Sequence, residues 1–526
     1  MIKYGKRELC SNFIKGEASM LEDRIKVYVT SYSEEVTGSN NHVIVEWPDG
    51  RKEAFVVDCG LFQEKDHNHI NAKKFPYKAD NISFAIATHV HTDHVGRFPY
   101  LVASGFAGRI YCSYETCQLL PVVLAETAER LEDEHRFDLK RYKDCKEKIK
   151  KLKTSGKGRG KKDRPTRQKC CKKSKKKEEA PHYPILIFGK EDIEQVMKQV
   201  VIQKMYQTFE PVPGIEMTFY PNAHIGGAIL TVCRIYNEKE EVYLLFTGDL
   251  GLTNPVTNSI TDIPDEVAAK IDIIVSESTY GSAEEAKNVE KERQKHMEII
   301  RDVYRKNGTI MYMSNSLERP LRVGVDIKDM QQDPRIENEI AAFNVYFDST
   351  FGIKCFNKYA KLFGKEYLPD NFATIDKDTR DQAVASSGPK MIICTSPRLY
   401  QGSFLNYGAK MLENSNVTLV FVAYVPDEIK NIISLPSGAE IDFMGEKVKL
   451  RCKRYQFGYY SSHVSTEELD AFLSKFPNAT SLLFNHGTHD SKNNHAARYK
   501  TCTNTTHNLL YGRAVMLTKS RIEKYF

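Results

Sequence analysis

The feature that most constrains this chain is the hexapeptide HVHTDH at residues 89–94, which places three histidines and one aspartate within six positions. An apolar run, ISFAIAT, directly precedes it and predicts a β-strand. Because alternate residues of an extended chain share a face, His89 and His91 point to the same side, and Asp93 and His94 can turn toward a neighbouring position where a helix begins. Imidazole nitrogens and carboxylate oxygens are ligands that zinc prefers. The spacing therefore predicts a centre for two metal ions in preference to a surface histidine cluster.

Three further motifs occur along the chain in a fixed order around the hexapeptide. They are VVDCG at residues 56–60, NAHIGGA at residues 222–228 and FTGDLG at residues 246–251. Taken in this order with HVHTDH, they resemble the metallo-β-lactamase superfamily, whose corresponding segments are a strand-end aspartate, AGHILGSA and GDLG. A single histidine or aspartate in such a segment is more often structural, so the order of the motifs carries the resemblance.

This resemblance implies a role for each polar residue of these motifs. It implies that His224 completes a first zinc site with the first two histidines of the hexapeptide. Asp249 bridges both ions, because a carboxylate offers two oxygens to a pair of ions about 3.5–4 Å apart. Asp93 and His94 belong to the second site. Asp58 orients one of the ligands without binding metal itself.

Four more motifs narrow the resemblance. They are SESTYG at residues 276–281, FDST at residues 347–350, SSHV at residues 461–464 and FNHG at residues 484–487. They are similar to motifs of the β-CASP family, the nucleic-acid-processing branch of the superfamily. Its members include ribonuclease J, the cleavage and polyadenylation endonuclease and shorter prokaryotic proteins, and the likeness is to the RNA-processing members.

Within this branch, the resemblance implies a further ligand and two further catalytic residues. His486 joins the second zinc, which already has Asp93. His463 gives a proton to the leaving oxygen, and Glu277 holds its imidazole in position. Two zinc ions lower the pKa of a water molecule from about 15.7 toward about 7, which makes hydroxide available at neutral pH. We therefore expect a zinc-dependent nuclease that hydrolyses phosphodiester bonds, with Asp58 and Asp93 among its catalytic residues and single-stranded RNA preferred over DNA as substrate.

Alternating strand and helix patterns along the chain predict an α/β protein. The resemblance implies a metallo-β-lactamase αββα sandwich with an inserted β-CASP α/β domain. We expect the first part of the sandwich at residues 1–305, the β-CASP domain at residues 306–437 and the second part of the sandwich at residues 438–526. Helical patterns are predicted at residues 113–136 and 191–206.

One segment of the expected β-CASP domain departs from the family pattern. Members of the family read G-R-A-Q after the first strand of this domain, whereas this chain reads LERPLR at residues 317–322. We expect this departure to affect the contacts of the substrate cleft and to leave the metal centre unchanged.

The net charge of +7 conceals a strongly basic segment. Residues 140–177 alone carry a net charge of +17, and the remainder of the chain carries −10. Overall charge is therefore a weak argument for nucleic-acid binding. The lysine-rich composition predicts a disordered loop at about residues 140–184. This loop is either a salt-sensitive tether for nucleic acid or a solvated insertion.

The twelve cysteines are scattered and form no C-x-x-C pair. We interpret them as reduced thiols, which indicates a cytoplasmic protein. The first twenty residues have no apolar segment typical of a secretory signal, and no apolar run reaches the roughly 20 residues of a membrane helix. We expect no membrane association.

Two other functions remain open at this stage. The first is a metallo-β-lactamase-fold hydrolase of a small ester or thioester, against which the β-CASP motifs argue. The second is a catalytically inactive β-CASP scaffold that binds RNA, which the loss of ligand residues would mark, and none is lost here. The sequence does not distinguish endonuclease from 5′-exonuclease activity and does not determine the oligomeric state.

Overall fold

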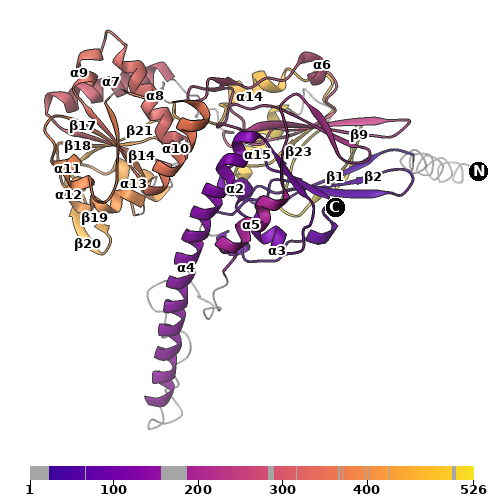
Figure 1. Ribbon diagram of the computed structural model, residues 1–526, viewed down its shortest axis with the longest axis horizontal. Coiled ribbons are helices and arrows are strands. Elements are labelled where there is room, and N and C mark those ends of the chain that lie inside the picture. The colour runs from indigo at the N-terminus through magenta and orange to yellow at the C-terminus, as the bar shows by residue number, and fades with distance from the viewer. Residues whose placement is uncertain are drawn as a thin grey trace, which may run out of the picture.

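The computed structural model describes residues 23–525, apart from residues 65–66, 156–185, 282–288, 365–367 and 500–504 and positions 316, 370, 397, 398, 401, 424, 426 and 520. Two units are visible in Figure 1, a two-sheet unit on the right and a unit built on one sheet on the left. The chain begins in the two-sheet unit, passes through the other and returns.

The first sheet of the two-sheet unit has eight strands and is antiparallel at one end and parallel at the other. In spatial order its strands are β25 (Arg521–Tyr525), β24 (Ala514–Thr518), β1 (Lys26–Ser31), β2 (Asn41–Glu46), β3 (Lys52–Val57), β4 (Phe84–Ile86), β5 (Arg109–Cys112) and β6 (Val200–Ile202). Parallel pairing begins where β3 meets β4, so the ends of these two strands lie on the same edge.

The second sheet has seven strands. They are β23 (Thr505–Asn508), β22 (Ser481–Phe484), β13 (Ile273–Ser276), β10 (Glu241–Phe246), β9 (Ile229–Tyr236), β8 (Ile215–Pro221) and β7 (Thr208–Val212). Strands β10, β13 and β22 run parallel, so the segments after Phe246, Ser276 and Phe484 also meet at one edge.

The two sheets pack face to face through a buried apolar layer that includes Val43 and Phe55 from the first and Phe219 and Phe246 from the second. Helices cover their outer faces. Those over the first sheet are α3 (Phe98–Ala103), α4 (Tyr114–Ser155) and α5 (Lys190–Gln199), and those over the second are α6 (Asp265–Ala268), α14 (Thr466–Leu473) and α15 (His489–Tyr499). This is the expected αββα sandwich.

The inserted unit is a parallel sheet of six strands with helices around it, as expected for a β-CASP domain. Its strands in spatial order are β16 (Phe372–Ile375), β15 (Asn344–Asp348), β17 (Lys390–Thr395), β14 (Thr309–Ser314), β18 (Val417–Phe421) and β21 (Lys453–Gln456). Its helices are α7 (Val289–Arg305), α8 (Arg319–Gln331), α9 (Glu337–Ala341), α10 (Thr350–Phe363), α11 (Arg380–Ala385), α12 (Gly408–Leu412) and α13 (Asp427–Ser434).

Strand β21 and the hairpin β19 (Glu440–Phe443) and β20 (Glu446–Lys449) extend this unit beyond the boundary expected at residue 437. Strand β21 pairs in parallel with β18, and Val448 and Leu450 are buried in the same apolar cluster as β18. The inserted unit therefore continues to Gln456, and it begins with α7, before the boundary expected at residue 306, because α7 packs against β14 and α9.

Two predicted helices end elsewhere than expected. Helix α4 continues past residue 136 to Ser155 and projects from the sandwich in Figure 1. Its extension contains no glycine or proline before Gly156, so nothing in the sequence stops it. Part of the predicted basic loop is thus helical, and residues 156–185 lie outside the described chain. Helix α5 ends at Gln199, because Val200–Ile202 pairs with β5 as a strand.

Within the described residues, no helix is both long and apolar enough to cross a bilayer.

Candidate metal centre

The hexapeptide lies at the edge of the first sheet, in the loop after β4 and in the short helix α2 (Thr92–Val95) that follows this loop. Asp58, which follows β3, holds the hexapeptide in place through both carboxylate oxygens. One oxygen accepts the backbone N–H of Thr88 at 2.8 Å, and the other lies 2.7 Å from Nδ1 of His94. Asp58 is 1% exposed and takes a left-handed backbone conformation with φ of 65°. A non-glycine residue in this region costs free energy and is often found at functional sites.

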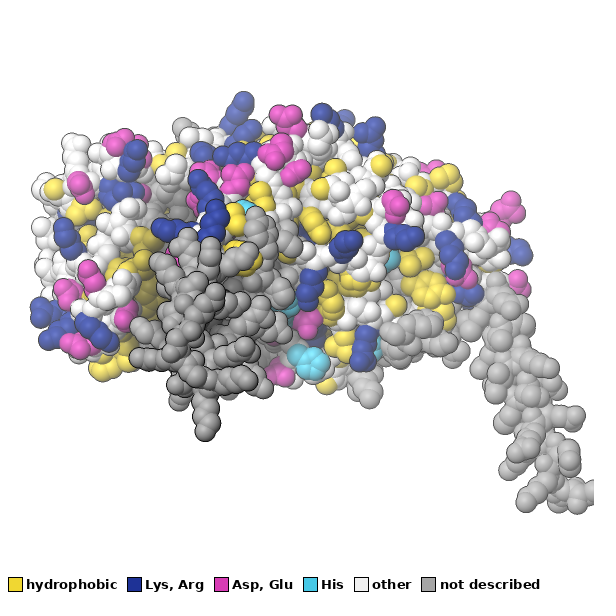
Figure 2. Space-filling model, turned by 90° about the horizontal axis from the view of Figure 1, so that it is seen from below, with side chains coloured by type: hydrophobic (Ala, Val, Ile, Leu, Met, Phe, Trp, Pro, Cys, Tyr) yellow, Lys and Arg dark blue, Asp and Glu magenta, His cyan; other side chains and the backbone are white. Residues whose placement is uncertain are grey.

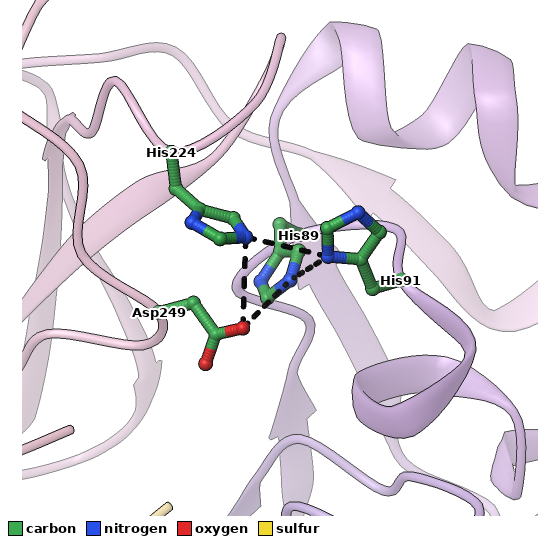
Figure 3. A group of neighbouring side chains, drawn as sticks. All are labelled: His89, His91, His224 and Asp249. Atoms are coloured by element: carbon green, nitrogen blue, oxygen red, sulfur yellow. Dashed lines mark hydrogen bonds and ion pairs between the residues drawn. The ribbon is translucent and has the colours of Figure 1, made fainter. Parts of the chain in front are cut away.

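The first group of candidate ligands comes from three loops (Figure 3). His89 Nε2 lies 2.9 Å from His91 Nδ1, and His224 Nε2 lies 3.4 Å from the same atom. Oδ2 of Asp249, in the loop after β10, lies 3.7 Å from His89 Nε2 and 3.6 Å from His224 Nε2. One ligand atom from each of the four residues therefore falls within 4.8 Å of the others.

The second group of candidate ligands consists of Asp93, His94 and His486. The Nε2 atoms of His94 and His486 lie 3.3 Å apart, and His486 Nε2 lies 3.8 Å from Asp93 Oδ2. Asp249 Oδ1 lies 3.1 Å from each of these two Nε2 atoms. Asp249 thus directs one carboxylate oxygen to each group.

The remote ring nitrogens of three of these histidines are already occupied. His94 Nδ1 faces Asp58, His89 Nδ1 lies 3.1 Å from the hydroxyl of Thr88, and His486 Nδ1 lies 3.1 Å from the hydroxyl of Thr279. Their Nε2 atoms consequently direct lone pairs at one another. Oδ1 of Asp249 is buried and accepts no hydrogen bond from any described residue. Converging lone pairs and an unpartnered carboxylate oxygen fit divalent cations, which would satisfy both.

The charge states of these groups suit the same purpose. Burial lowers the pKa of His89 and of His224 well below the ordinary value, and it lowers the pKa of His91 to about 4. These imidazoles are neutral at pH 7 and keep a lone pair for a cation. Burial alone would raise the pKa of Asp249, but His486 and His94 more than offset it and hold that pKa well below the ordinary value. The first group therefore joins neutral nitrogens to an ionised carboxylate, whereas in the second group Asp249 raises the pKa of His94 and of His486 against the effect of burial.

His463 and Glu277 form a pair at the rim of the two groups. Glu277 follows β13 and is 2% exposed, and its Oε2 lies 2.8 Å from Nδ1 of His463. The other carboxylate oxygen accepts the backbone N–H of Leu250. Nε2 of His463 is directed inward and lies 3.9 Å from Asp249 Oδ2. The carboxylate thereby orients the imidazole so that Nε2 points toward the two candidate ligand groups.

The structure brings together all the residues that the sequence singled out, although their segments are far apart in the chain. Seven of them form the two candidate groups, His463 and Glu277 form the rim pair, and Asp58 lies one hydrogen bond outside. His495, one of the histidines left out of the predicted centre, instead lies 2.7 Å from the carbonyl of Tyr280 through Nε2.

Asn222 supports the centre and was not predicted. Its Nδ2 donates to the carbonyls of Thr247 and Asp249, and its Oδ1 accepts the backbone N–H groups of His224 and Gly251. It therefore fixes the two loops that carry His224 and Asp249 relative to each other. Its position two residues before His224, in the NAHIGGA motif, is the signal that the sequence offered.

Helix α8 of the inserted unit also contacts the centre in a way that the sequence did not predict. Glu318 accepts the backbone N–H of Gly226 at 2.7 Å, and Arg322 donates to the carbonyl of His224 at 3.1 Å. Glu318 and Arg322 pair with each other at 3.1 Å and are 2% and 8% exposed. This buried ion pair lies in the LERPLR segment. The residues that depart from the family pattern therefore form a contact between the two units.

Two family profiles match the chain. A profile of the metallo-beta-lactamase superfamily matches residues 36–292, and a profile of the Zn-dependent metallo-hydrolase RNA specificity domain matches residues 447–508. The first match includes Glu277 and six of the seven clustered residues, and the second includes His463 and His486. Both profiles imply a metal cofactor.

Curated relatives match most of the chain at low identity. Ribonuclease TTHA0252 of Thermus thermophilus is 24% identical over 463 residues, which cover 84% of this chain and 89% of that protein. Cleavage and polyadenylation specificity factor subunit 3-II of Arabidopsis thaliana is 24% identical over 83% of this chain and 64% of its own length. Transcription termination factor FttA of Methanosarcina mazei is 20% identical over 82% and 63%. The chain thus spans less than two-thirds of the length of the last two.

Proposed function

Because the chain belongs to the metallo-β-lactamase superfamily, in its β-CASP branch, we propose that it is a metal-dependent ribonuclease that hydrolyses phosphodiester bonds in single-stranded RNA. The observation that carries this proposal is the position of Asp249. Its two carboxylate oxygens face two separate groups of candidate ligands, and His463 lies 3.9 Å from one of these oxygens. A two-ion centre with a proton donor at its rim is the arrangement that phosphodiester hydrolysis needs.

We assign two zinc ions to this centre. His89, His91 and His224 would hold the first, Asp93, His94 and His486 the second, with Asp249 between them. Nitrogen and oxygen donors suit zinc, and five imidazoles with two carboxylates leave a two-ion centre net positive. A positive centre accepts an anionic phosphate. When bound, the ions would supply Lewis-acid stabilisation of the phosphoryl charge and hydroxide at neutral pH.

The chain itself supplies the proton that the leaving oxygen needs. Nδ1 of His463 is engaged by Glu277, so Nε2 is the atom that would carry and release the proton. Glu277 keeps this orientation because its second oxygen is held by the backbone of Leu250, next to Asp249. A carboxylate that holds an imidazole in one tautomer in this way is a recurring device of hydrolytic enzymes.

The RNA preference rests on the family context. The profile that matches residues 447–508 is described as an RNA specificity domain, and Ribonuclease TTHA0252 aligns over most of both chains. The inserted unit lies beside the centre, since Glu318 and Arg322 contact the loop of His224. It can therefore offer additional surface to a long substrate, which an enzyme that hydrolyses small esters does not need.

The proposal is tested by incubating the zinc-loaded full-length protein with end-labelled single-stranded RNA, the same sequence as DNA, and a small chromogenic ester. We expect the RNA to be cut, and labelling each end in turn will distinguish internal cuts from stepwise removal at the 5′ end. Asp249→Asn serves as the inactive control, because a neutral amide cannot replace a carboxylate between two cations. Ester hydrolysis without RNA cleavage would contradict the proposal, and so would RNA binding without any cleavage.

A further inference from the structure

Helix α8 begins with an arginine that lies at the junction of the two units. Arg319 is half-buried, and its Nη1 donates to the carbonyl of Val422, directly after β18 of the inserted unit, at 2.9 Å. Its Nη2 lies 3.3 Å from the hydroxyl of Ser462, the residue before His463. The carbonyl of Ser462 in turn packs against Gly251 beside His224. The guanidinium is thus placed one residue from the proposed proton donor.

Both acceptors of Arg319 are uncharged. Among the residues that the structure describes, no carboxylate lies within ion-pair distance of this guanidinium. A guanidinium has five N–H donors, and two are used here. Within the described part of the chain, Arg319 therefore retains donors and forms no ion pair at the rim of the centre.

The neighbouring carboxylate of Glu318 does not form an ion pair with Arg319. Oε1 of Glu318 accepts from Asn254 and Arg322, and its Oε2 accepts from Gly226. Glu318 is therefore committed to Arg322 and to the loop of His224. Burial, and then the charge of Arg322, lower the pKa of Arg319 to about 10. The guanidinium therefore stays protonated at neutral pH, although its charged form is destabilised. An anion bound beside it would stabilise the charged form.

A half-buried arginine without a carboxylate is not by itself a binding site, as Arg454 shows. Arg454 donates to the carbonyls of Ile432, Leu435 and Cys452, all within the inserted unit. Its donors are directed at the protein that surrounds it. Arg319 differs because it stands beside His463, where a substrate must pass.

We propose that Arg319 binds a backbone phosphate of the RNA substrate, next to the scissile bond and on the side of His463. The inference rests on the proposed function. The planar guanidinium presents paired donors that match two phosphate oxygens, and such charge-assisted bonds are strong. Among the coloured side chains of the face seen in Figure 2, basic and acidic groups are interspersed.

The test compares kcat and KM of the zinc-loaded full-length protein on a set of single-stranded RNAs, each with one phosphate replaced by a neutral methylphosphonate. Wild type, Arg319→Met, Arg319→Lys and the control Arg454→Met are measured at several salt concentrations. In wild type, one methylphosphonate beside the scissile bond should raise KM roughly 10- to 100-fold. The same replacement should cost Arg319→Met almost nothing, because its contact is already lost, and should cost Arg319→Lys an intermediate factor.

Salt dependence provides a second reading. For Arg319→Met, the slope of log(1/KM) against log salt should fall by about 0.7, the value for one single-strand phosphate contact, and for Arg454→Met it should not change. The proposal is overturned if Arg319→Met loses the same factor on every RNA with an unchanged slope, since Arg319 would then only join the two units. If Arg319→Met does not fold, Arg319→Lys decides, because an unreduced penalty at that linkage contradicts the proposal. Failure of wild type to cut any unmodified RNA would contradict the proposed function instead.

Discussion

Nδ1 of His463 lies 2.8 Å from a carboxylate oxygen of Glu277, although 186 positions separate the two residues in the chain. The contact joins the end of β13 in the sandwich to the loop that follows β21 of the inserted unit. We expect His463→Ala to slow RNA cleavage by about 10²–10⁴-fold, the usual contribution of a positioned general acid. The metal content should stay at the wild-type value, because His463 belongs to neither ligand group. Single-turnover rates and elemental analysis of the same preparation check both points, and cleavage at the wild-type rate would remove this role.

Gly251 provides a test of how closely the two catalytic loops approach. A Cβ at Gly251 would lie 2.6 Å from the carbonyl of Ser462 and 2.8 Å from Cα of His224. Gly251→Ala must therefore separate the loops of His224 and His463, and we expect a large loss of activity together with weaker metal retention.

The matched control for this variant is Gly458→Ala. At Gly458 the nearest atom to an added Cβ is a side-chain oxygen of Glu292 at 3.6 Å, an ordinary contact. Activity and zinc content of this control should be close to those of wild type. Equal activity of the Gly251 and Gly458 variants would show that the approach of the loops is not needed.

The buried pair of Glu318 and Arg322 predicts a large effect on stability. Arg322→Met leaves the Glu318 carboxylate buried without its cation, which costs about 3–5 kcal/mol in comparable cases. The variant should unfold at lower urea concentration and should lose zinc more readily, because Arg322 holds the carbonyl of His224. Arg335→Met, which breaks an exposed pair with Asp333, should change the urea midpoint little. Similar midpoints for the two variants would contradict the account of this contact.

His42 predicts a specific pH dependence of stability. Its ring is 7% exposed and stacks on Tyr77 with centroids 4.6 Å apart, and burial lowers its pKa from 6.5 to about 4. The unfolded chain thus binds a proton between pH 6.5 and 4 that the folded chain does not. Stability from this group is complete above pH 6.5 and is lost as the pH falls toward 4, by roughly 3 kcal/mol.

The measurement is urea unfolding of wild type and His42→Phe at several pH values, since phenylalanine keeps the stacked ring but cannot titrate. Other groups titrate equally in both proteins, so the difference between the two isolates His42. A difference that stays constant between pH 6.5 and 4 would show that His42 does not titrate as its burial requires.

Much of the fold could be predicted because its signals are local. An apolar run predicted β4, and the hexapeptide after it located the centre, since both depend on neighbouring residues only. Residues 200–202 were predicted as helix because the end of α5 depends on pairing with β5, more than eighty positions away. The place of β21 in the inserted sheet likewise depends on its pairing with β18.

The residues of the candidate centre likewise fall into those that the sequence predicted and those that it did not. The residues that bear the chemistry were found through their motifs, but those that hold the motifs together were not. Asn222 and Glu318 act through backbone groups of distant loops, so their roles appear only when β8, β10 and α8 are placed in space. The LERPLR segment was noticed as a departure from the family pattern, yet its composition alone did not indicate that Glu318 and Arg322 would pair against the loop of His224.

In the proposed function, zinc bound at the two groups around Asp249 makes this chain a ribonuclease. The most direct measurement is a titration of the chelator-treated protein with zinc, in which the initial rate of cleavage of end-labelled single-stranded RNA is followed. The account predicts no cleavage without metal, a rise in rate that levels off near two zinc ions per chain, and none of this for Asp249→Asn. Cleavage that persists without metal, or a rate that stays at zero through the whole titration, would contradict it.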